Sequence, residues 1–153
     1  MVCPLVSDIY GSRVCHGTQA QMCAKQWAIE YNAQNTPKKV DFIEAFVVEL
    51  VDRPGRPLVG MEQFVEGIFV KHNNNVGGVV ADRDSERATP NALSHFTWHA
   101  SNNTLLVCDI QGVGDDYTDP QIHTVSGKGF GKGNLGQASL ARPVRPVLGI
   151  GPP

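Results

Sequence analysis

The sequence lacks the features that mark membrane, secreted and nucleic-acid-binding proteins. It contains no run of about eighteen apolar residues, and its first ten residues have neither the basic region nor the long apolar region of a signal peptide. Thirteen Lys and Arg against fifteen Asp and Glu give a net charge of −2. This balance excludes a nucleic-acid binder that works by bulk positive charge, and it excludes an acidic tail protein. We therefore expect a soluble cytoplasmic protein with neither a nucleic-acid nor a membrane partner.

Cysteine and histidine are too scattered to form a disulfide framework or a complete metal site. The four cysteines include no Cys-x-x-Cys pair, so we expect them to be reduced and packed. His95 and His99 are spaced to share a helix face, but two ligands do not complete a tetrahedral zinc site.

The residues that are present are typical of one globular domain. The 153 residues are 41% apolar and 18% charged, which is typical of a folded chain with its own core. Sixteen Gly and ten Pro predict many loops. The sequence contains no internal repeats.

The first half of the sequence predicts a helix followed by a hairpin. Residues 18–33 place apolar side chains on one stripe of a helix, with Thr18 as its N-cap. The stripe consists of Ala20, Ala24, Trp27, Ala28 and Tyr31. Residues 40–51 are rich in β-branched and aromatic side chains, which predicts a largely buried strand. The turn at residues 52–57 then returns the chain into a second strand from residue 58.

The second half predicts a helix, a strand and a tail. The charged segment 81–87 is expected to be an exposed loop, after which Thr89 and Pro90 begin a helix that ends at Asn102 and Asn103. The apolar run from residue 104 to residue 110 predicts a short central strand. The Pro-rich residues 137–153 follow neither a helical nor a strand period, and we expect them to be unstructured.

Oxygen-bearing side chains follow the strand at residues 104–110. Asp109 and Gln111 stand at its end before a Gly-Val-Gly turn, Asp119 follows on a second turn, and three Asn residues stand beside Lys71. Carboxylate and amide oxygens suit Mg²⁺, and a lysine suits a phosphate. The same residues are common in ordinary turns, so the pattern alone leaves a purely structural role open. The Gly-rich stretch at residues 127–136 does not match a Walker loop, because no Gly-Lys-Ser/Thr follows at the required spacing.

The order and wording of these motifs resemble the alpha-kinase family of atypical protein kinases. The segments that carry the resemblance are VEGIFVKHNNNVGG, then ALSHFTWHASNNTLLVCDIQGVGDDYTDPQIHT, then FGKGNLG. Residues 31–58 are most similar to the elongation-factor-2 kinases of that family. The resemblance implies an α+β, protein-kinase-like fold of two lobes that bind ATP between them. It also implies transfer of the γ-phosphate of ATP, with Mg²⁺, to a Ser or Thr hydroxyl of a protein substrate.

The resemblance assigns the metal and catalytic roles to the second half of the chain. Asp109 and Gln111 match the Asp-x-Gln pair of the family, and Asp119 matches the aspartate of its Thr-Asp-Pro motif. Together with Asn75 these residues would hold Mg²⁺ and orient the acceptor hydroxyl. Asp109 and Asp119 both remain candidates for the base, because the resemblance does not divide the base and metal roles between them.

Other residues match the nucleotide and substrate contacts of the family. Glu62 and Phe64 match the hinge that contacts adenine, and Lys71 lies near the nucleotide. His72 and His123 are expected to be supporting or solvent-facing residues, and Cys108 is expected in the core on the face opposite Asp109. The loop that would meet a peptide substrate contains Gly131, Gly133, Asn134 and Gly136.

The sequence also departs from the family pattern at both ends. We expect residues 8–136 to be a partial alpha-kinase domain with an incomplete N-lobe, in which Lys25, Lys38 and Lys39 are surface lysines. Cys23 stands where the elongation-factor-2 kinases have Glu. His95 matches a zinc-binding histidine of the family, whose other ligands belong to a C-terminal zinc module that has no counterpart here. One lone histidine does not hold structural zinc.

Two further hypotheses follow from these departures. The chain could be a catalytically dead or truncated relative that acts as a binding module, or its ends could be misassigned. A chain without the upstream strands and the zinc ligands is expected to gain little stability from Mg·ATP and to transfer phosphate undetectably.

Overall fold

The computed structural model describes residues 13–76 and 88–140, and the structural statements below concern these residues. Their elements, in chain order, are α1 (Arg13–Asn32), β1 (Asp41–Phe42), β2 (Ala45–Glu49), β3 (Leu58–Glu62), β4 (Phe69–Lys71), α2 (Ala88–Ala100), β5 (Leu105–Cys108), β6 (Gln111–Val113), β7 (Asp116–Thr118), β8 (Gln121–Thr124), the 3₁₀ turn η1 (Gly131–Gly133) and α3 (Gln137–Leu140). The mixture of helices and strands confirms the predicted α+β class.

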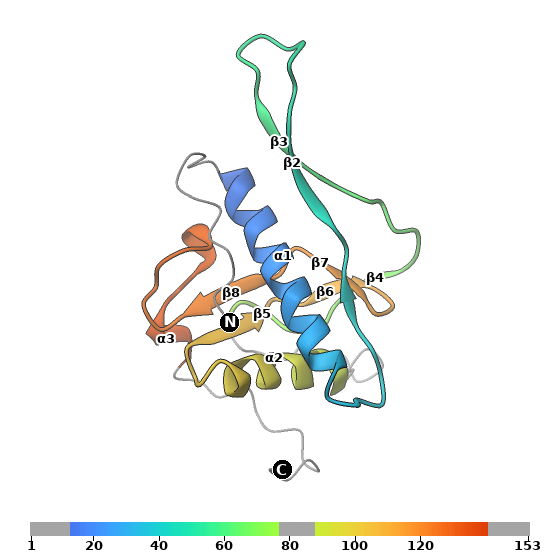
Figure 1. Cartoon of the computed structure of the whole chain (residues 1–153), viewed down its shortest axis with the longest axis vertical. Helices are drawn as coiled ribbons and strands as arrows, with labels where there is room; N and C mark the ends of the chain where they lie inside the picture. The colour runs from blue at the N-terminus through green and yellow to red at the C-terminus, as the bar shows by residue number, and fades with distance from the viewer. Residues whose placement is uncertain (1–12, 77–87, 141–153) are drawn as a thin grey trace.

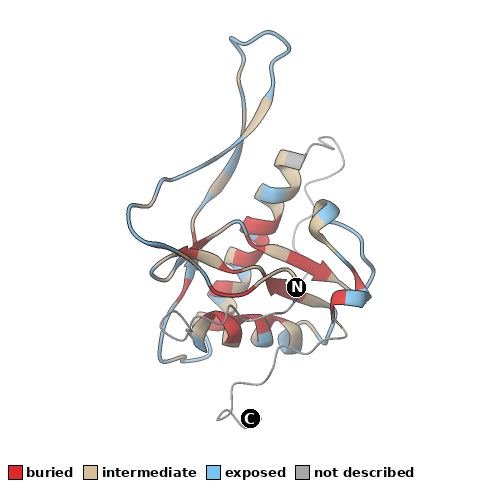
Figure 2. Ribbon diagram, turned by 180° about the vertical axis from the view of Figure 1, so that it is seen from behind, coloured by how far each residue is buried: buried red, intermediate tan, exposed pale blue. Residues whose placement is uncertain are grey.

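The strands form three small sheets. A four-stranded sheet has the order β1-β7-β6-β4, β2 pairs with β3 as an antiparallel hairpin, and β5 pairs with β8. Helix α1 crosses the middle of the molecule and α2 lies along β5, while the hairpin extends away from the body (Figure 1). Buried residues are concentrated in the body and are absent from the far half of the hairpin (Figure 2).

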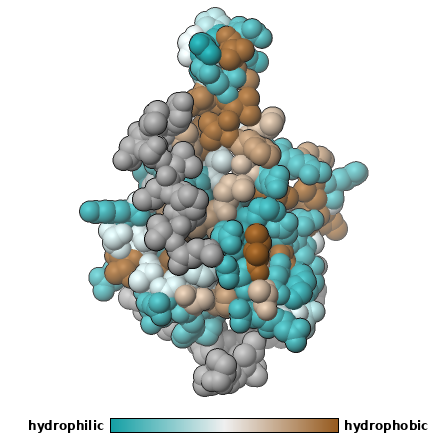
Figure 3. Space-filling model, viewed as in Figure 1, coloured by the Kyte–Doolittle hydropathy of each residue, from teal (hydrophilic) through white to brown (hydrophobic). Residues whose placement is uncertain are grey.

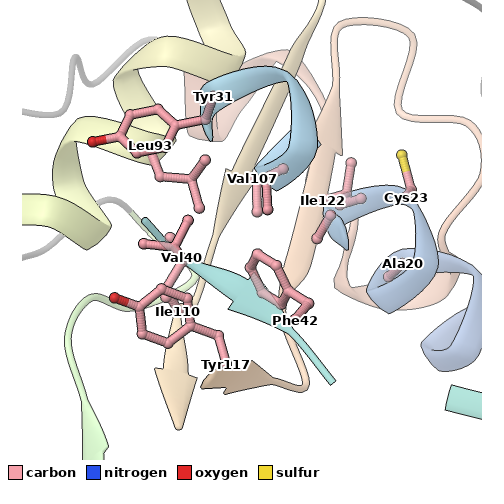
Figure 4. Packing of buried hydrophobic residues seen from close by; sticks show 12 residues of the cluster. Ala20, Cys23, Tyr31, Val40, Phe42, Leu93, Val107, Ile110, Tyr117 and Ile122 are labelled. Atoms are coloured by element: carbon pink, nitrogen blue, oxygen red, sulfur yellow. The ribbon is translucent and has the colours of Figure 1, made fainter. Parts of the chain in front are cut away.

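The core lies where α1, α2 and the strands of the body meet (Figure 4). Phe42 and Tyr117 stack edge to face with ring centroids 5.6 Å apart, and both side chains are fully buried. Their backbones are register partners in the parallel β1–β7 pair, so one face of the four-stranded sheet supplies the core. The opposite face is thereby left for other contacts.

Helix α1 confirms the predicted apolar stripe and corrects its start. Ala20, Ala24, Ala28 and Tyr31 are buried, and Trp27 packs against them. Thr18 is not an N-cap, because it lies inside the helix and its hydroxyl donates to the carbonyl oxygen of Val14 at 3.1 Å. The sequence did not predict the part of α1 before Thr18, because this part contains Gly17 and shows little hydrophobic periodicity.

The predicted hairpin is present, but its first strand is not largely buried. Residues 40–51 divide into β1 and β2, and in β2 Phe46 is 50% exposed. Phe46 pairs with Met61, so their side chains share the face that points away from α1, whereas Gly60 lies on the face that meets Val14. Figure 3 shows hydrophobic residues gathered along this hairpin. β-branched composition identified the strands but not what covers them.

The other expected elements agree in position with small corrections. Helix α2 spans the predicted helix, and Asn102 and Asn103 after it adopt the left-handed conformation with φ of 55° and 59°. Strand β5 is buried as predicted, but it is not central, since β8 is its only sheet partner among the described residues.

The last described residues differ from the tail that the sequence predicts. Residues 137–140 form α3, in which Ser139 is buried. The charged segment 81–87 and residues 141–153 lie outside the described residues. Within the described part of the chain, no helix is long and apolar enough to cross a membrane.

Candidate functional site

The candidate site lies on the outer face of the four-stranded sheet. Lys71 of β4 is the register partner of Gln111 of β6, which is in turn the partner of Thr118 of β7. Directly paired residues point to the same side of a sheet, so these three side chains form a row. The neighbouring register row contains Tyr117, which faces the core. The row is therefore on the face that the core does not use.

Asp109 adjoins this row at the junction between β5 and β6. One of its carboxylate oxygens lies 2.6 Å from the Lys71 ammonium, and its side chain is 14% exposed. Its backbone adopts the left-handed conformation, with φ of 57°. Buried Asn73 fixes the next residue by accepting the Ile110 N–H at 2.8 Å. The carboxylate is thus held against a lysine from a left-handed backbone, a conformation in which Gly, Asn and Asp are more common than other residues.

Asp119 lies close to Asp109 on the turn after β7. It also has a left-handed backbone, with φ of 46°, and its carbonyl oxygen accepts the Gln111 side-chain amide at 3.2 Å. Partial burial and the nearby carboxylates of Asp109 and Glu62 raise the pKa of Asp119, while Lys71 opposes the shift. Two candidate catalytic carboxylates therefore share one electrostatic environment with one lysine. Such a group of like charges favours a bound cation.

Glu62 enters the site from the end of the hairpin. Its carboxylate accepts the Thr118 hydroxyl at 2.7 Å and the side-chain amide of Gln21 at 3.0 Å. Gln21 belongs to α1 and was not identified from the sequence. A polar side chain on the stripe of Ala24 and Ala28, and hence buried, was the available signal, because buried polar groups require partners.

The segment after Glu62 crosses the same outer face. Gly67 approaches Val113 so closely that an added Cβ would lie 2.4 Å from a Val113 methyl group. Residues 63–66 line an open cavity of about 460 Å³ together with Asp41 and Asp116. Phe64 lines this cavity, but it is 86% exposed and is therefore largely open to solvent.

Asn75 contacts Cys108, the residue before Asp109, and the Gly-rich loop. Its side-chain oxygen is 3.8 Å from the Cys108 sulfur, and its side-chain amide donates to the Gly133 carbonyl oxygen at 3.4 Å. The structure therefore brings together Lys71, Asp109, Gln111, Asp119 and Glu62, and leaves Asn75 at the border with the Gly-rich loop.

His123 is fully buried and connects Asn75 to the Gly-rich loop, so it is not solvent-facing. Its Nδ1 accepts the Leu135 N–H at 3.1 Å, which leaves Nε2 as the protonated nitrogen that donates to the Asn75 carbonyl oxygen at 2.7 Å. Burial lowers the pKa of His123 and thus favours the neutral ring that this pairing needs. His72 is also buried, with its ring 5.7 Å from that of Tyr117.

The Gly-rich loop is ordered by Asn134. Its side chain accepts the N–H groups of Thr124 and Gly136 and donates to the carbonyl oxygens of Lys128 and Gly129. The glycines have a steric role at two points. An added Cβ would lie 1.6 Å from the Gln121 side chain at Gly133, and 3.0 Å from His16 at Gly131, where φ is 73°.

Lys25 is not a free surface lysine. Its ammonium lies 2.8 Å from the Asp41 carboxylate and donates to the Phe42 carbonyl oxygen at 2.8 Å, and its side chain is only 19% exposed. Lys38 forms a more exposed ion pair with Asp115. Lys25 thus fastens β1 to α1.

Cys108 and His95 lie outside the row of site residues. Burial raises the pKa of the Cys108 thiol to about 12, in agreement with the predicted core position. His95 is exposed on α2, with Nε2 3.1 Å from Nε2 of His99. The partial burial of its ring and the neighbouring His99 lower the pKa of His95.

The side chains around Asp109 fit Mg²⁺ rather than zinc. Among the described residues, no cluster of three or more His, Cys, Asp or Glu side chains is arranged to hold a metal. Asp109 and Asp119 supply carboxylate oxygens, and Gln111 keeps its side-chain oxygen while its amide is bonded to the Asp119 backbone. Mg²⁺ is commonly bound by one or two carboxylates together with phosphate oxygens and water, so this donor set is sufficient only with a phosphate ligand.

Comparison with known proteins identifies relatives over nearly the whole described region. The alpha-kinase family model matches residues 10–142. The chain is 56% identical to myosin heavy chain kinase B of Dictyostelium discoideum over 123 residues, covering 80% of this chain and 16% of that protein. It is 49% identical to human eukaryotic elongation factor 2 kinase over 138 residues, covering 90% of this chain and 18% of that protein.

Solved structures show the same fold. The alpha-kinase domain of myosin heavy chain kinase A in complex with ADP superposes with a TM-score of 0.77 at 46% identity, over 83% of this chain and 51% of that one. The same domain in complex with AMP-PNP gives 0.78 at 43% identity, over 88% and 53%. The chain thus spans about half the length of these solved domains and less than a fifth of the two curated relatives.

Proposed function

The chain belongs to the alpha-kinase family, and from this membership we propose that it acts as a Mg²⁺-dependent serine/threonine protein kinase that takes its phosphate from ATP. The observation that carries the proposal is the convergence of Asp109, Asp119 and Gln111 with Lys71 on one face of the sheet. The relatives are named as kinases, and two solved relatives are complexes with ADP and AMP-PNP.

Each site residue has a role that its position supports. Phosphoryl transfer requires in-line positioning, neutralised phosphate charge and a carboxylate that accepts the hydroxyl proton. Lys71 would move from the Asp109 carboxylate to a phosphate oxygen when nucleotide binds. Asp109, Asp119 and Gln111 would hold Mg²⁺, which supplies neutralisation of the phosphate charge, and Asn75 would join them by turning its side-chain oxygen away from the Cys108 sulfur. The oxygen of the substrate Ser or Thr hydroxyl would bond to the γ-phosphorus of ATP as ADP leaves. Asp109 or Asp119 would accept the proton of that hydroxyl.

The nucleotide and the protein substrate would approach this face from different sides. Glu62 and Phe64 would contact the adenine, since the segment from residue 62 crosses the outer face beside the row. The substrate loop of Gly131, Gly133, Asn134 and Gly136 would present the acceptor hydroxyl, since Asn75 joins it to the site. We propose a two-lobed domain in a cytoplasmic protein, in which the described residues supply this catalytic face.

The alternative is a binding module that holds Mg·ATP or a partner without transferring phosphate. The exposure of Phe64 favours this alternative for the chain by itself, because an adenine contact that is 86% exposed offers little enclosure to a nucleotide.

Transfer from radiolabelled ATP to a Ser/Thr protein substrate, measured alongside calorimetric Mg·ATP binding, tests the proposal. The kinase predicts transfer by the unaltered chain and none by Asp109→Ala, with Asp52→Ala, at an exposed aspartate in the turn between β2 and β3, as the matched control. Binding without transfer identifies the binding module. A chain that binds no Mg·ATP, or an Asp109→Ala variant that transfers at full rate, contradicts the proposal.

A further inference from the structure

Gln21 of α1 uses both ends of its buried side-chain amide to join separate parts of the site. Its Oε1 accepts the Asp119 backbone N–H at 2.8 Å, and its Nε2 donates to the Glu62 carboxylate at 3.0 Å and to the Ile43 carbonyl oxygen at 2.9 Å. The residue is only 3% exposed. A buried carboxamide whose donors and acceptor are all engaged has one orientation, because the flipped amide would place N–H against N–H.

The Thr118 hydroxyl lies within hydrogen-bond distance of both the Glu62 carboxylate and Gln21 Oε1. Its oxygen lies 2.7 Å from the Glu62 carboxylate and 3.2 Å from Gln21 Oε1, but it carries one proton. The shorter contact and the negative charge of Glu62 direct that proton to the carboxylate. The Asp119 N–H is therefore the principal donor to Gln21 Oε1.

We propose that Gln21 is a positioning residue that fixes the adenine-side Glu62 relative to Asp119, an inference that rests on the proposed function. The geometry supports this role because Gln21 emerges from the same helix as Ala24 and Ala28, which are fully buried. Glu62 belongs to the hairpin and Asp119 to the turn after β7. Their hydrogen bonds to Gln21 anchor each of them to a core helix rather than to another loop. The Asp119 N–H that Gln21 accepts belongs to a residue with a left-handed backbone, with φ of 46°.

Three variants separate positioning from simple loss of stability. Gln21→Met keeps the length of the side chain and removes its polar atoms. Gln21→Glu keeps an acceptor for the Asp119 N–H but opposes a second carboxylate to Glu62. The reciprocal double variant Gln21→Glu/Glu62→Gln restores a donor–acceptor pair with the polarity reversed. Gln26→Met on the exposed side of the same helix is the control.

The measurements are amide hydrogen exchange at Asp119 and calorimetric affinity for Mg·ADP, on the full chain. We expect Gln21→Met to speed Asp119 exchange and to weaken Mg·ADP binding, each by about tenfold or more, the effect of one hydrogen bond to a buried or charged group. Gln21→Glu should retain Asp119 protection and still weaken binding. It should weaken binding less in the Glu62→Gln background than in the unaltered chain, a comparison that corrects for loss of the Glu62 contact itself. Gln26→Met should change neither quantity.

Recovery by the reciprocal swap is the decisive result, because a merely structural glutamine would not respond to a partner exchange at Glu62. The inference is overturned if Gln21→Met behaves like Gln26→Met, or if Gln21→Glu weakens binding equally in the unaltered chain and in Glu62→Gln. If Gln21→Met does not fold, the two glutamate variants still decide the outcome. An unaltered chain that binds no Mg·ADP contradicts the proposed function instead, and Asp119 exchange then decides whether Gln21 fixes that turn.

Discussion

Asp109 and Asp119 hold a backbone conformation that disfavours most side chains. Both have positive φ, and each is fixed from outside its own turn, Asp109 through Asn73 and Lys71 and Asp119 through Gln21. Non-glycine residues in such conformations are concentrated at functional sites, because neighbouring structure must enforce them. Asn35, Arg56, Asn102, Asn103 and Phe130 also have positive φ, so the conformation alone does not mark a site. What distinguishes Asp109 and Asp119 is that side chains from distant elements hold each of them in place.

Comparing Asp109→Gly with Asp109→Ala separates the fold from the function at this position. Alanine bears the steric cost of the left-handed backbone, of about 1 kcal/mol, whereas glycine does not. We expect the glycine variant to be at least as stable as the alanine variant in urea unfolding, while both lose Mg·ADP binding. A clearly more stable alanine variant would show that φ at this residue is not constrained as described.

The Cys108 thiol should be unreactive in the folded chain. Burial raises its pKa to about 12, so the nucleophilic thiolate is nearly absent at pH 8. Alkylation followed by peptide mass spectrometry should modify the half-buried Cys15 before Cys108. Modification of Cys108 at the same rate as Cys15 under native conditions would contradict its position in the core.

At the scale of elements, the sheet brings Lys71, Gln111 and Thr118 into one row, and Gly112 makes this alignment possible. An added Cβ at Gly112 would lie 2.1 Å from the Asp116 carbonyl oxygen, which belongs to the neighbouring strand. No side chain fits there unless β6 and β7 separate.

Gly112→Ala should therefore destabilise the fold by about 2–4 kcal/mol and weaken nucleotide binding through displacement of Gln111. Gly114→Ala is the matched control, since it also has positive φ but meets no atom within 4 Å. Thermal unfolding of the two variants should show the larger loss at Gly112. Equal losses would mean that backbone strain, rather than the close approach of β6 and β7, accounts for the cost.

Local sequence patterns predicted elements well where one periodicity determined burial. The stripe of α1 was identified because helix spacing and small apolar residues coincide. Asp109 was placed near a strand end, but β5 ends at Cys108 and Gln111 begins β6 instead of ending the same strand. Exposure of β2 was not predicted, since a β-branched run does not reveal whether anything covers its outer face. Gln21 was missed because its partners lie 22, 41, 97 and 98 positions away along the chain.

At the scale of the whole molecule, the described residues combine a packed body with an extended hairpin. Phe46 and Met61 present an apolar face outward, while the candidate site lies on the sheet near the base of the hairpin. The carboxylates of the site are held by contacts to the body, while the cavity beside residues 63–66 is open. The resemblance named Lys71, Asp109, Gln111 and Asp119 together with Asn75, and the structure gathers the first four while Asn75 contacts Cys108 and Gly133; their roles stay predictions.

The central claim is that Lys71, Asp109, Gln111 and Asp119 form one metal–nucleotide site, and paramagnetic broadening by Mn²⁺·ADP tests it most directly. In amide NMR spectra of the ¹⁵N-labelled chain, Mn²⁺ takes the place of Mg²⁺ and broadens signals of nearby residues. The account predicts that the amides of these four residues broaden first, that those around His95 do not, and that Asp109→Ala abolishes the effect. Broadening centred elsewhere, or unchanged in Asp109→Ala, would contradict it.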